Sequence, residues 1–320
     1  GGSAGARGLV LGWARERGME SLFDGQGHAP APAGPDETGA EPEGLVALDC
    51  PDWLDAPLRQ GLGAEFPAVM AALRARAPVF VRVNLTRLSR EAAVEVLAAE
   101  GIEAVAHPLA ASALEVRTGA RKLQQGRAYA DGLIELQDAA SQAVVEMWPL
   151  RDGMAVLDLC AGGGGKTLAM AARARLRLAA HDADPRRMAD LPMRAARAGA
   201  ELRLVERPET AGPWDLILTD VPCSGSGSWR RDPEGKWALT PARLESLITV
   251  QAGIMDRAAA MLGPGGVLGY ATCSMIEAEN GAQIAAFRAR HPGWDLVAER
   301  RFTPLEGGDG FFGAVLRRQG

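Results

Sequence analysis

Short apolar runs alternate with helical patterns over the second half of the chain. The apolar runs lie at 155–159, 176–181, 201–205, 214–219 and 267–270. Helical spacing of apolar residues lies between or after them, at 166–174, 185–198, 240–262 and 277–290. Continuous apolar strands separated by helices are typical of parallel sheets covered on both faces. The pattern therefore predicts a doubly wound α/β domain over 135–320, with the terminal runs 294–299 and 311–317 as an antiparallel pair at one edge.

A shorter α+β pattern precedes this domain. The run 79–83 predicts a strand, and strand patterns recur at 103–107 and 114–117. Between the first two, Ser89 is a suitable N-cap for a helix that ends near Gly101. We therefore expect a small α+β module over 79–134.

The first 78 residues predict a helical extension. Apolar spacing is helical over 1–24 and again over 51–77. The segment between them, about 25–44, is rich in Gly, Pro, Ala and acidic residues, a composition typical of flexible linkers. The expected organisation is a helical extension over 1–78, the small module over 79–134 and the α/β domain over 135–320.

Composition narrows the class of protein. The chain has 320 residues, 47% hydrophobic and 23% charged, so a sizeable core is expected. No apolar run approaches the roughly 20 residues of a membrane-spanning helix, and no signal-peptide pattern opens the chain. Four cysteines without a Cys-x-x-Cys pair provide neither a disulfide framework nor a zinc site. We expect a cytoplasmic, monomeric protein that binds neither membrane nor metal. The net charge of −5 argues mildly against a protein coated with nucleic acid but allows a local basic groove.

Two of the cysteines stand just beyond predicted strands. Cys223 follows the run 214–219, and Cys273 follows the run 267–270. If the two strands are parallel neighbours, both thiols lie at the carboxyl edge of the sheet, where open α/β folds bind their ligands. Asp220 lies at the same edge, where it could bond an exocyclic amine or a ring nitrogen. A buried, inert thiol is the alternative, which we favour for Cys50 and Cys160.

A glycine-rich loop joins the first strand of this sheet to a helix. It contains Cys160 and Ala161, then Gly162, Gly163, Gly164 and Gly165, then Lys166. A phosphate-binding P-loop needs glycine where Cys160 stands, and the dinucleotide pattern Gly-x-Gly-x-x-Gly also fails. The S-adenosylmethionine (SAM) loop of a Rossmann-like methyltransferase remains. Asp182 after the second strand supports it, because an acid there can accept both ribose hydroxyls. A glycine turn without a ligand is the alternative.

Three ordered motifs resemble the Sun/Nop family of RNA cytosine-5 methyltransferases. They are Asp-Leu-Cys-Ala-Gly-Gly-Gly-Gly-Lys-Thr at 158–167, Asp-Val-Pro-Cys-Ser-Gly at 220–225 and Tyr-Ala-Thr-Cys-Ser at 270–274. Gly162 and Gly163 depart from the family, which has Ala-Pro at these positions. The family also has an acid after the third strand, near the adenine, where this chain offers only Glu206 and Glu209 close to Pro208.

The resemblance implies a SAM-dependent enzyme that forms 5-methylcytosine in RNA, with small-subunit (16S) ribosomal RNA as the expected substrate. It assigns attack on cytosine carbon 6 to Cys273 and release of the product to Cys223, roles that the chemistry alone leaves exchangeable. Asp220, from its place before the Pro-Cys turn, is a candidate for both catalysis and cofactor binding, and we expect the module 79–134 to bind RNA.

Basic and aromatic residues follow the Pro-Cys motif. Arg230, Arg231 and Lys236 are candidates for RNA contacts, against the alternative of a solvated surface. Three other functions stay open: a ribosome-assembly factor that has lost SAM binding, a methyltransferase for transfer RNA, and a methyltransferase for an amine or amide. The last usually has an Asn/Asp-Pro-Pro-aromatic turn where this chain has Asp-Val-Pro-Cys.

Overall fold

The computed structural model describes residues 5–39 and 41–320, and the chain divides into two compact units after Cys50. The first unit contains α1 (Ala6–Glu16), η1 (Glu20–Leu22) and α2 (Gly44–Ala47). Its small core consists of Leu11, Ala14 and Phe23. The helical pattern over 1–24 corresponds to α1 and η1, except that residues 1–4 lie outside the described part. Among the described residues, no helix is both long and apolar enough to cross a membrane.

The second unit begins with a helical segment, as expected over 51–77. It consists of η2 (Asp52–Leu54), α3 (Asp55–Leu62), η3 (Gly63–Glu65) and α4 (Phe66–Arg74). Buried side chains such as Leu58, Phe66 and Met70 line one side of it. Gly61 lies directly on the backbone after Cys273, because a Cβ at this glycine would be 2.2 Å from the Met275 carbonyl oxygen. The helical segment therefore packs directly against the backbone that follows Cys273.

A four-stranded antiparallel sheet follows, with the order β2-β3-β1-β4. Its strands are β1 (Val79–Val83), β2 (Glu103–Ala106), β3 (Ala113–Thr118) and β4 (Ile134–Leu136). The helices beside it are α5 (Arg90–Ala99), η4 (Ala120–Gln125) and α6 (Arg127–Ala130). The Ser89 side chain accepts a hydrogen bond from the Ala92 amide and caps α5, as expected. The sequence pattern did not predict β4, a strand of only three residues that pairs with β1.

The third part is a seven-stranded sheet with the order β10-β11-β9-β8-β5-β6-β7. Its strands are β5 (Ala155–Asp158), β6 (Arg177–Ala180), β7 (Arg203–Leu204), β8 (Trp214–Asp220), β9 (Leu262–Thr272), β10 (Trp294–Phe302) and β11 (Phe311–Arg318). Strands β5 to β9 are parallel, and β11 runs antiparallel between β9 and β10. The predicted α/β fold with an antiparallel pair at one edge is confirmed.

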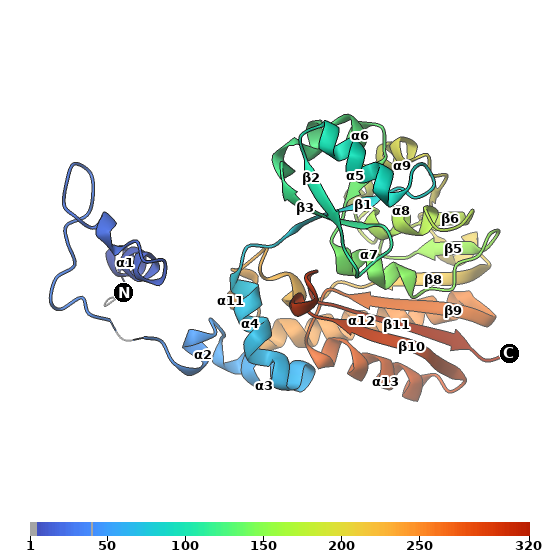
Figure 1. Cartoon of the computed structure of the whole chain (residues 1–320). Helices are drawn as coiled ribbons and strands as arrows, with labels where there is room; N and C mark the ends of the chain where they lie inside the picture. Colours follow the sequence, from blue (N-terminus) through green and yellow to red (C-terminus); the bar gives the residue numbers. More distant parts are fainter. Residues whose placement is uncertain (1–4, 40) are drawn as a thin grey trace. The chain divides into compact units, whose positions relative to one another are not determined.

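Helices cover both faces of this sheet (Figure 1). One face packs on α12 (Pro241–Met261) and α13 (Gly281–Arg290), with Leu157 and Leu268 among the strand residues in that core. The other face packs on α7 (Ala139–Glu146) and α8 (Gly165–Ala171), with Val156 and Leu216 pointing to that side. The remaining helices are η5 (Pro185–Met188), α9 (Leu191–Ala198), α10 (Pro208–Ala211), η6 (Ser226–Ser228), α11 (Gly235–Ala238), η7 (Glu277–Glu279) and η8 (Pro304–Glu306).

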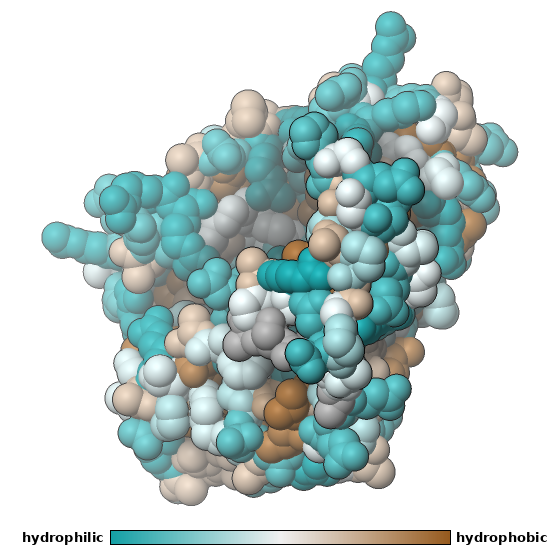
Figure 2. All heavy atoms as spheres, turned by 90° about the vertical axis from the view of Figure 1, so that its left-hand side faces the viewer, coloured by the Kyte–Doolittle hydropathy of each residue, from teal (hydrophilic) through white to brown (hydrophobic). Residues whose placement is uncertain are grey.

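Three predicted elements differ from the structure, one of them the helix expected over 277–290, which is divided at Asn280 into η7 and α13. The strand expected over 201–205 is reduced to the two residues of β7. The helix expected over 185–198 is divided into η5 and α9, because Pro192 lies in the first turn of α9, where a missing N–H is tolerated. On the face shown in Figure 2, hydrophilic atoms predominate and the strongly hydrophobic ones form small separate groups.

Candidate active site

The two predicted thiols lie together at the carboxyl edge of the seven-stranded sheet. Strand β8 ends at Asp220 and the parallel strand β9 ends at Thr272, with Asp220 opposite Ala271 in the register. Cys223 and Cys273 follow these ends, and their Sγ atoms are 3.3 Å apart. The parallel pairing of the two apolar strands thus produces the juxtaposition that the sequence predicted.

The two thiols differ in acidity. The hydrogen bond with Cys223 lowers the pKa of Cys273, and the nearby Lys166 ammonium acts in the same direction. The same hydrogen bond raises the pKa of Cys223, and burial adds to the effect. Cys273 is therefore the thiol that ionises more readily, and when it is a thiolate the Cys223 thiol donates the hydrogen bond to it. A thiolate is the nucleophilic form of cysteine.

Glu279, which the sequence analysis did not single out, ties the two cysteine loops together. Its carboxylate is fully buried and accepts hydrogen bonds from the Ser224 amide at 2.8 Å and the Gln251 side-chain amide at 2.9 Å. The hydroxyls of Ser224 and Ser274 donate to its other oxygen, each at 2.5 Å. Because these serines directly follow the two cysteines, this one carboxylate fixes both loops. An acid six residues beyond the second cysteine was the only signal in the sequence.

The glycine loop lies beside this pair, between β5 and α8. Gly162 and Gly164 have φ values of +50° and +81°, which residues other than glycine rarely adopt. The Gly162 amide donates to Asp182 Oδ2 at 2.8 Å. Asp182 is buried, and Arg187 lies 3.3 Å from the same oxygen. The structure thus brings the predicted loop and the acid after β6 into direct contact.

Lys166 and Asp220 connect the glycine loop to the thiols. The buried Lys166 ammonium forms a 2.7 Å ion pair with Asp220 and lies 4.9 Å from the ring centroid of Phe311. Asp220 keeps 31% of its side chain exposed, so it stays accessible from the edge of the sheet.

Cys160 is half-buried, and burial raises the pKa of its thiol. This direction fits the inert role expected for Cys160 as a thiol.

Asp158 lies beneath the glycine loop. Its Oδ2 accepts a hydrogen bond from the Thr167 hydroxyl at 2.6 Å, whereas Oδ1 is buried without a hydrogen-bond partner. Burial raises the pKa of Asp158 to about 7. The site therefore contains a carboxyl group that titrates near neutral pH.

The basic residues after Cys223 are mostly engaged within the chain. Arg230 has a side chain that is 4% exposed and forms a 2.7 Å ion pair with Asp309. Arg231 binds the other oxygen of Asp309 at 2.6 Å and keeps 38% of its side chain exposed. Lys236 is buried. Of the three predicted RNA contacts, only Arg231 offers an exposed side chain in this conformation, and a direct role of all three in RNA binding stays a prediction.

The turn after Cys223 is hydrogen-bonded to the segment that precedes β11. Gly227 donates its amide to the Cys273 carbonyl at 2.9 Å and accepts at 2.9 Å from the Gly310 amide. A Cβ at Gly227 would be 1.9 Å from the Gly310 carbonyl oxygen, so only glycine fits there. The turn after Cys223 is therefore held by the segment that leads into β11.

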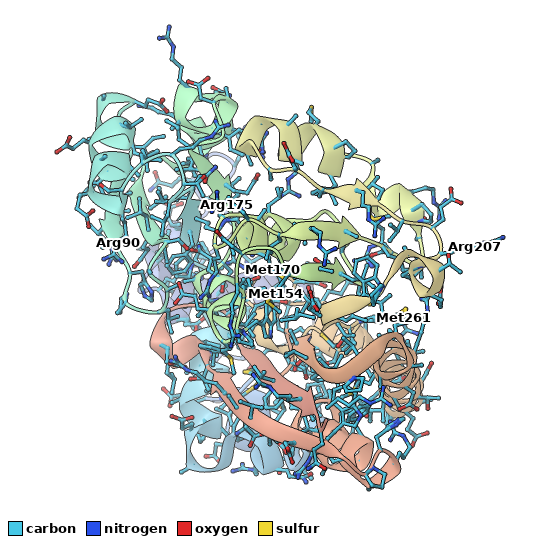
Figure 3. The ribbon with its side chains drawn as sticks, turned by 90° about the vertical axis from the view of Figure 1, so that its right-hand side faces the viewer. Arg90, Met154, Met170, Arg175, Arg207 and Met261 are labelled. Carbon is cyan, nitrogen blue, oxygen red and sulfur yellow. The ribbon has the colours of Figure 1, made fainter. Side chains whose placement is uncertain are left out.

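The two acids that the sequence offered after β7, Glu206 and Glu209, are both directed away from a buried site. Glu206 is exposed, and Glu209 forms a 2.6 Å ion pair with Arg257 of α12. The neighbouring Arg207 lies at the periphery of the molecule (Figure 3). His181, which follows β6, is bonded to the Val205 carbonyl at 2.9 Å. Among the described residues, no cluster of His, Cys, Asp and Glu could hold a metal ion.

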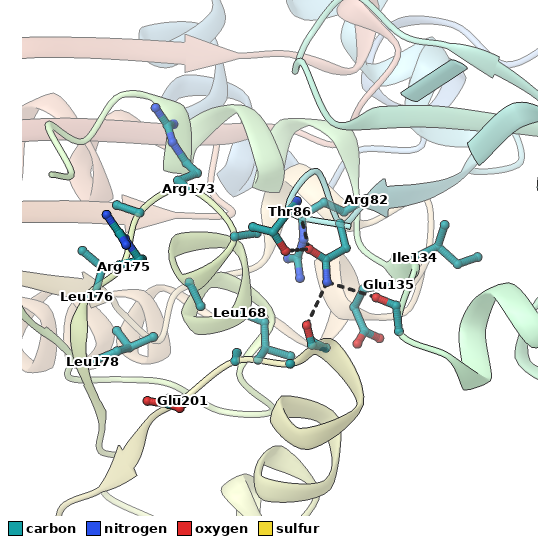
Figure 4. Close-up of a pocket in the computed structure, with 18 of the residues that line it drawn as sticks. Arg82, Thr86, Ile134, Glu135, Leu168, Arg173, Arg175, Leu176, Leu178 and Glu201 are labelled. Carbon is teal, nitrogen blue, oxygen red and sulfur yellow. Dashed lines mark hydrogen bonds between the residues drawn. The ribbon is translucent and has the colours of Figure 1, made fainter. Parts of the chain in front are cut away.

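A cavity of about 610 Å³ lies apart from the thiols, where the four-stranded sheet meets α8 and β6 (Figure 4). Arg82, Glu135, Leu168 and Leu178 are among the residues that line it. Neither cysteine of the pair lies on its wall. The reactive groups are therefore on the open edge of the sheet rather than in this cavity.

Comparison with known proteins places the chain in a family. Residues 146–316 match the model of the 16S rRNA methyltransferase RsmB/F, and residues 50–121 match the ferredoxin-like domain that accompanies it. The chain belongs to the RsmB/F methyltransferase family. The resemblance to the Sun/Nop family is thereby confirmed, and the four-stranded sheet is the ferredoxin-like module.

Curated RsmB/F relatives are similar over most of the chain. The ribosomal RNA small subunit methyltransferase B of Erwinia tasmaniensis is 33% identical over 285 residues, which cover 84% of this chain and 66% of that protein. The protein of the same name from Klebsiella pneumoniae is also 33% identical, over 83% of this chain and 65% of its own length. The chain thus spans just under two thirds of these relatives.

Solved structures share the fold. The crystal structure of PH0851 superposes with a TM-score of 0.80 and 26% identity, covering 97% of this chain and 73% of that one. NSun6 from Pyrococcus horikoshii, crystallised with SFG, superposes with a TM-score of 0.74 and 19% identity, covering 84% of this chain and 98% of that one. The second likeness concerns the fold alone.

Proposed function

We propose that this chain is a SAM-dependent RNA methyltransferase that forms 5-methylcytosine in small-subunit ribosomal RNA. The observation that carries the proposal is the pair of thiols 3.3 Å apart, of which Cys273 has the lowered pKa, beside a glycine loop and an accessible carboxylate. Membership of the RsmB/F family and the relatives named for the small-subunit RNA support the substrate.

The residues at the carboxyl edge fit SAM. This molecule carries a positively charged amine and sulfonium and two ribose hydroxyls, so it needs acceptors. Asp158, Asp182 and Asp220 provide carboxylates around the loop 160–166, and Asp158 Oδ1 is a buried acceptor without a partner. When bound there, SAM supplies the methyl group. The loop backbone, Asp182 and Asp220 would hold it.

The two cysteines perform the covalent steps on cytosine. The Cys273 thiolate adds to carbon 6, which makes carbon 5 nucleophilic enough to accept the methyl group. Water then takes the carbon 5 proton, the electron pair of that C–H bond re-forms the double bond between carbons 5 and 6, and the bond from sulfur to carbon 6 breaks with its electron pair returning to Cys273. Cys223 assists this release, and Asp220 hydrogen-bonds the exocyclic amine or nitrogen 3 of the ring. The ferredoxin-like module and Arg231 contribute to RNA binding.

Single-cysteine variants test the proposal with an RNA substrate and SAM. Cys223→Ala should accumulate a covalent complex of RNA and protein on a denaturing gel, because the adduct forms but is not released. Cys273→Ala should form none. The reverse pattern would exchange the two roles, and no adduct in either variant would contradict the mechanism.

Calorimetry with SAM separates this function from that of an assembly factor that has lost its cofactor. No binding at millimolar SAM would favour the assembly factor. Bisulfite sequencing of ribosomal and transfer RNA from a deletion strain would then identify the modified class of RNA.

A further inference from the structure

Two arginines donate hydrogen bonds to backbone carbonyls of the glycine loop. Arg194 of α9 donates a hydrogen bond from Nη1 to the Gly163 carbonyl. Arg82 of β1 donates from Nη1 to the Gly165 carbonyl at 2.7 Å. The two side chains thus bind two carbonyls of the loop that lie two residues apart.

The ferredoxin-like module supports both arginines. Glu135 of β4 is the cross-strand partner of Arg82, and both line the cavity in Figure 4. The Glu135 carboxylate is 3.4 Å from Arg194 and 2.8 Å from Arg197. Its side chain is 8% exposed, and that of Arg194 is 19% exposed. A buried carboxylate is stable when it is paired, so Glu135 keeps Arg194 directed at the loop.

The loop that Arg194 binds has little restraint from its own residues. Gly162 to Gly165 are four consecutive glycines, and glycine leaves the backbone free, whereas a proline would fix φ. A Cβ at Gly163 would be 3.0 Å from Arg194 Nη1. The guanidinium therefore occupies space beside Gly163 that the ring of a proline would need.

We propose that Arg194, held by Glu135, is a positioning residue that keeps the glycine-only SAM loop in its binding conformation. The inference rests on the proposed function for its ligand. It also implies that the ferredoxin-like module contributes to cofactor affinity through a residue that does not touch the cofactor.

Arg194→Met tests the inference, because it keeps much of the side-chain volume and removes the hydrogen bond. Losing one charge-assisted hydrogen bond that orders the loop should weaken binding of S-adenosylhomocysteine about tenfold in calorimetry. Arg194→Lys should recover part of this loss. Arg197→Met is the matched control, since Arg197 binds the same carboxylate from the same helix and stacks on Tyr129 rather than on the loop. Its affinity should stay within about twofold of that of the wild type.

A second-site proline provides the rescue. In the double variant Gly163→Pro, Arg194→Met, the ring enters the space that the guanidinium leaves, and affinity should return to within about twofold of that of the wild type. In the described part of the chain, the Gly163 amide donates no backbone hydrogen bond that the proline would remove. Failure of this rescue would contradict a role in restraining the loop.

Hydrogen exchange of the loop amides in the ligand-free protein provides a readout independent of the cofactor. Exchange at the hydrogen-bonded amides of Gly162 and Gly164 should rise about tenfold in Arg194→Met and stay unchanged in Arg197→Met. Unchanged exchange in Arg194→Met would overturn the inference alone. If the exchange rises but the wild type does not bind S-adenosylhomocysteine, the proposed function fails while the role of Arg194 in ordering the loop stands.

Discussion

Replacing Glu279 should destabilise the protein and separate the two cysteine loops. In Glu279→Ala, the Ser224 amide and one of the two N–H groups of the Gln251 side chain lose their acceptor, while the other N–H group keeps its bond to the Pro222 carbonyl. Each buried donor left unpaired costs about 1–3 kcal/mol, so the free energy of unfolding should fall by about 4 kcal/mol. In Glu279→Gln, the hydroxyls of Ser224 and Ser274 can rotate to accept from the new amide. That variant should lose only about 1–2 kcal/mol.

Calorimetric unfolding measures this difference. For a protein of this size, a loss of about 4 kcal/mol lowers the midpoint by roughly 8–16 °C, and a loss of about 1–2 kcal/mol by roughly 2–8 °C. Glu277→Ala is the control, because Glu277 lies in the same turn but makes a partly exposed ion pair with Arg301. It should cost less than about 1 kcal/mol.

The covalent RNA complex provides the functional half of the test. Introduced into the Cys223→Ala background, Glu279→Gln should preserve most of the complex, because Ser274 keeps its position next to Cys273. Glu279→Ala should lose most of it at a temperature where the variant is still folded. A midpoint for Glu279→Ala within about 2 °C of that of Glu277→Ala would refute the proposed role of the carboxylate.

Two further predictions concern buried charges. Burial raises the pKa of Asp158 to about 7, so the folded protein keeps a proton on this carboxyl group up to that pH. The unfolded chain releases the same proton near pH 4. The free energy of unfolding should therefore fall as the pH rises from about 4 to about 7. Between pH 5 and pH 7.5, the wild type should therefore lose about 2.5 kcal/mol of unfolding free energy relative to Asp158→Asn in urea unfolding, and equal pH profiles would contradict the raised pKa. Arg230→Ala should cost about 3 kcal/mol in the same assay because its ion pair with Asp309 is buried, and the more exposed Arg231→Ala less than about 1 kcal/mol. Unchanged stability with reduced RNA affinity in Arg230→Ala would show that this side chain leaves its ion pair to bind RNA.

The sequence predicts the parts of this site that depend on neighbouring strands. Continuous apolar runs identify β8 and β9, and the cysteines just beyond them follow at one sheet edge. Short elements are harder, because the three residues of β4 and the two of β7 are too few to show a period.

Contacts between distant residues could not be predicted from the local pattern. Arg230 stands in a basic, aromatic stretch that fits an RNA contact, yet its partner Asp309 lies 79 positions further along the chain. Glu279 likewise follows Cys273 in an ordinary polar turn, and only the fold brings it to Ser224, 55 positions earlier. The chemistry of a residue type can be read locally, whereas its partner depends on the topology.

The close contact between Gly227 and Gly310 has a consequence for the order in which the site is completed during synthesis. The turn after Cys223 depends on the backbone of Gly310 and on Asp309, and β11 inserts between two strands that are made before it. A nascent chain that has not yet released residues 309–318 from the ribosome therefore carries both cysteines on an unfinished edge. The edge that carries the two thiols is therefore completed only after β11 has entered the sheet.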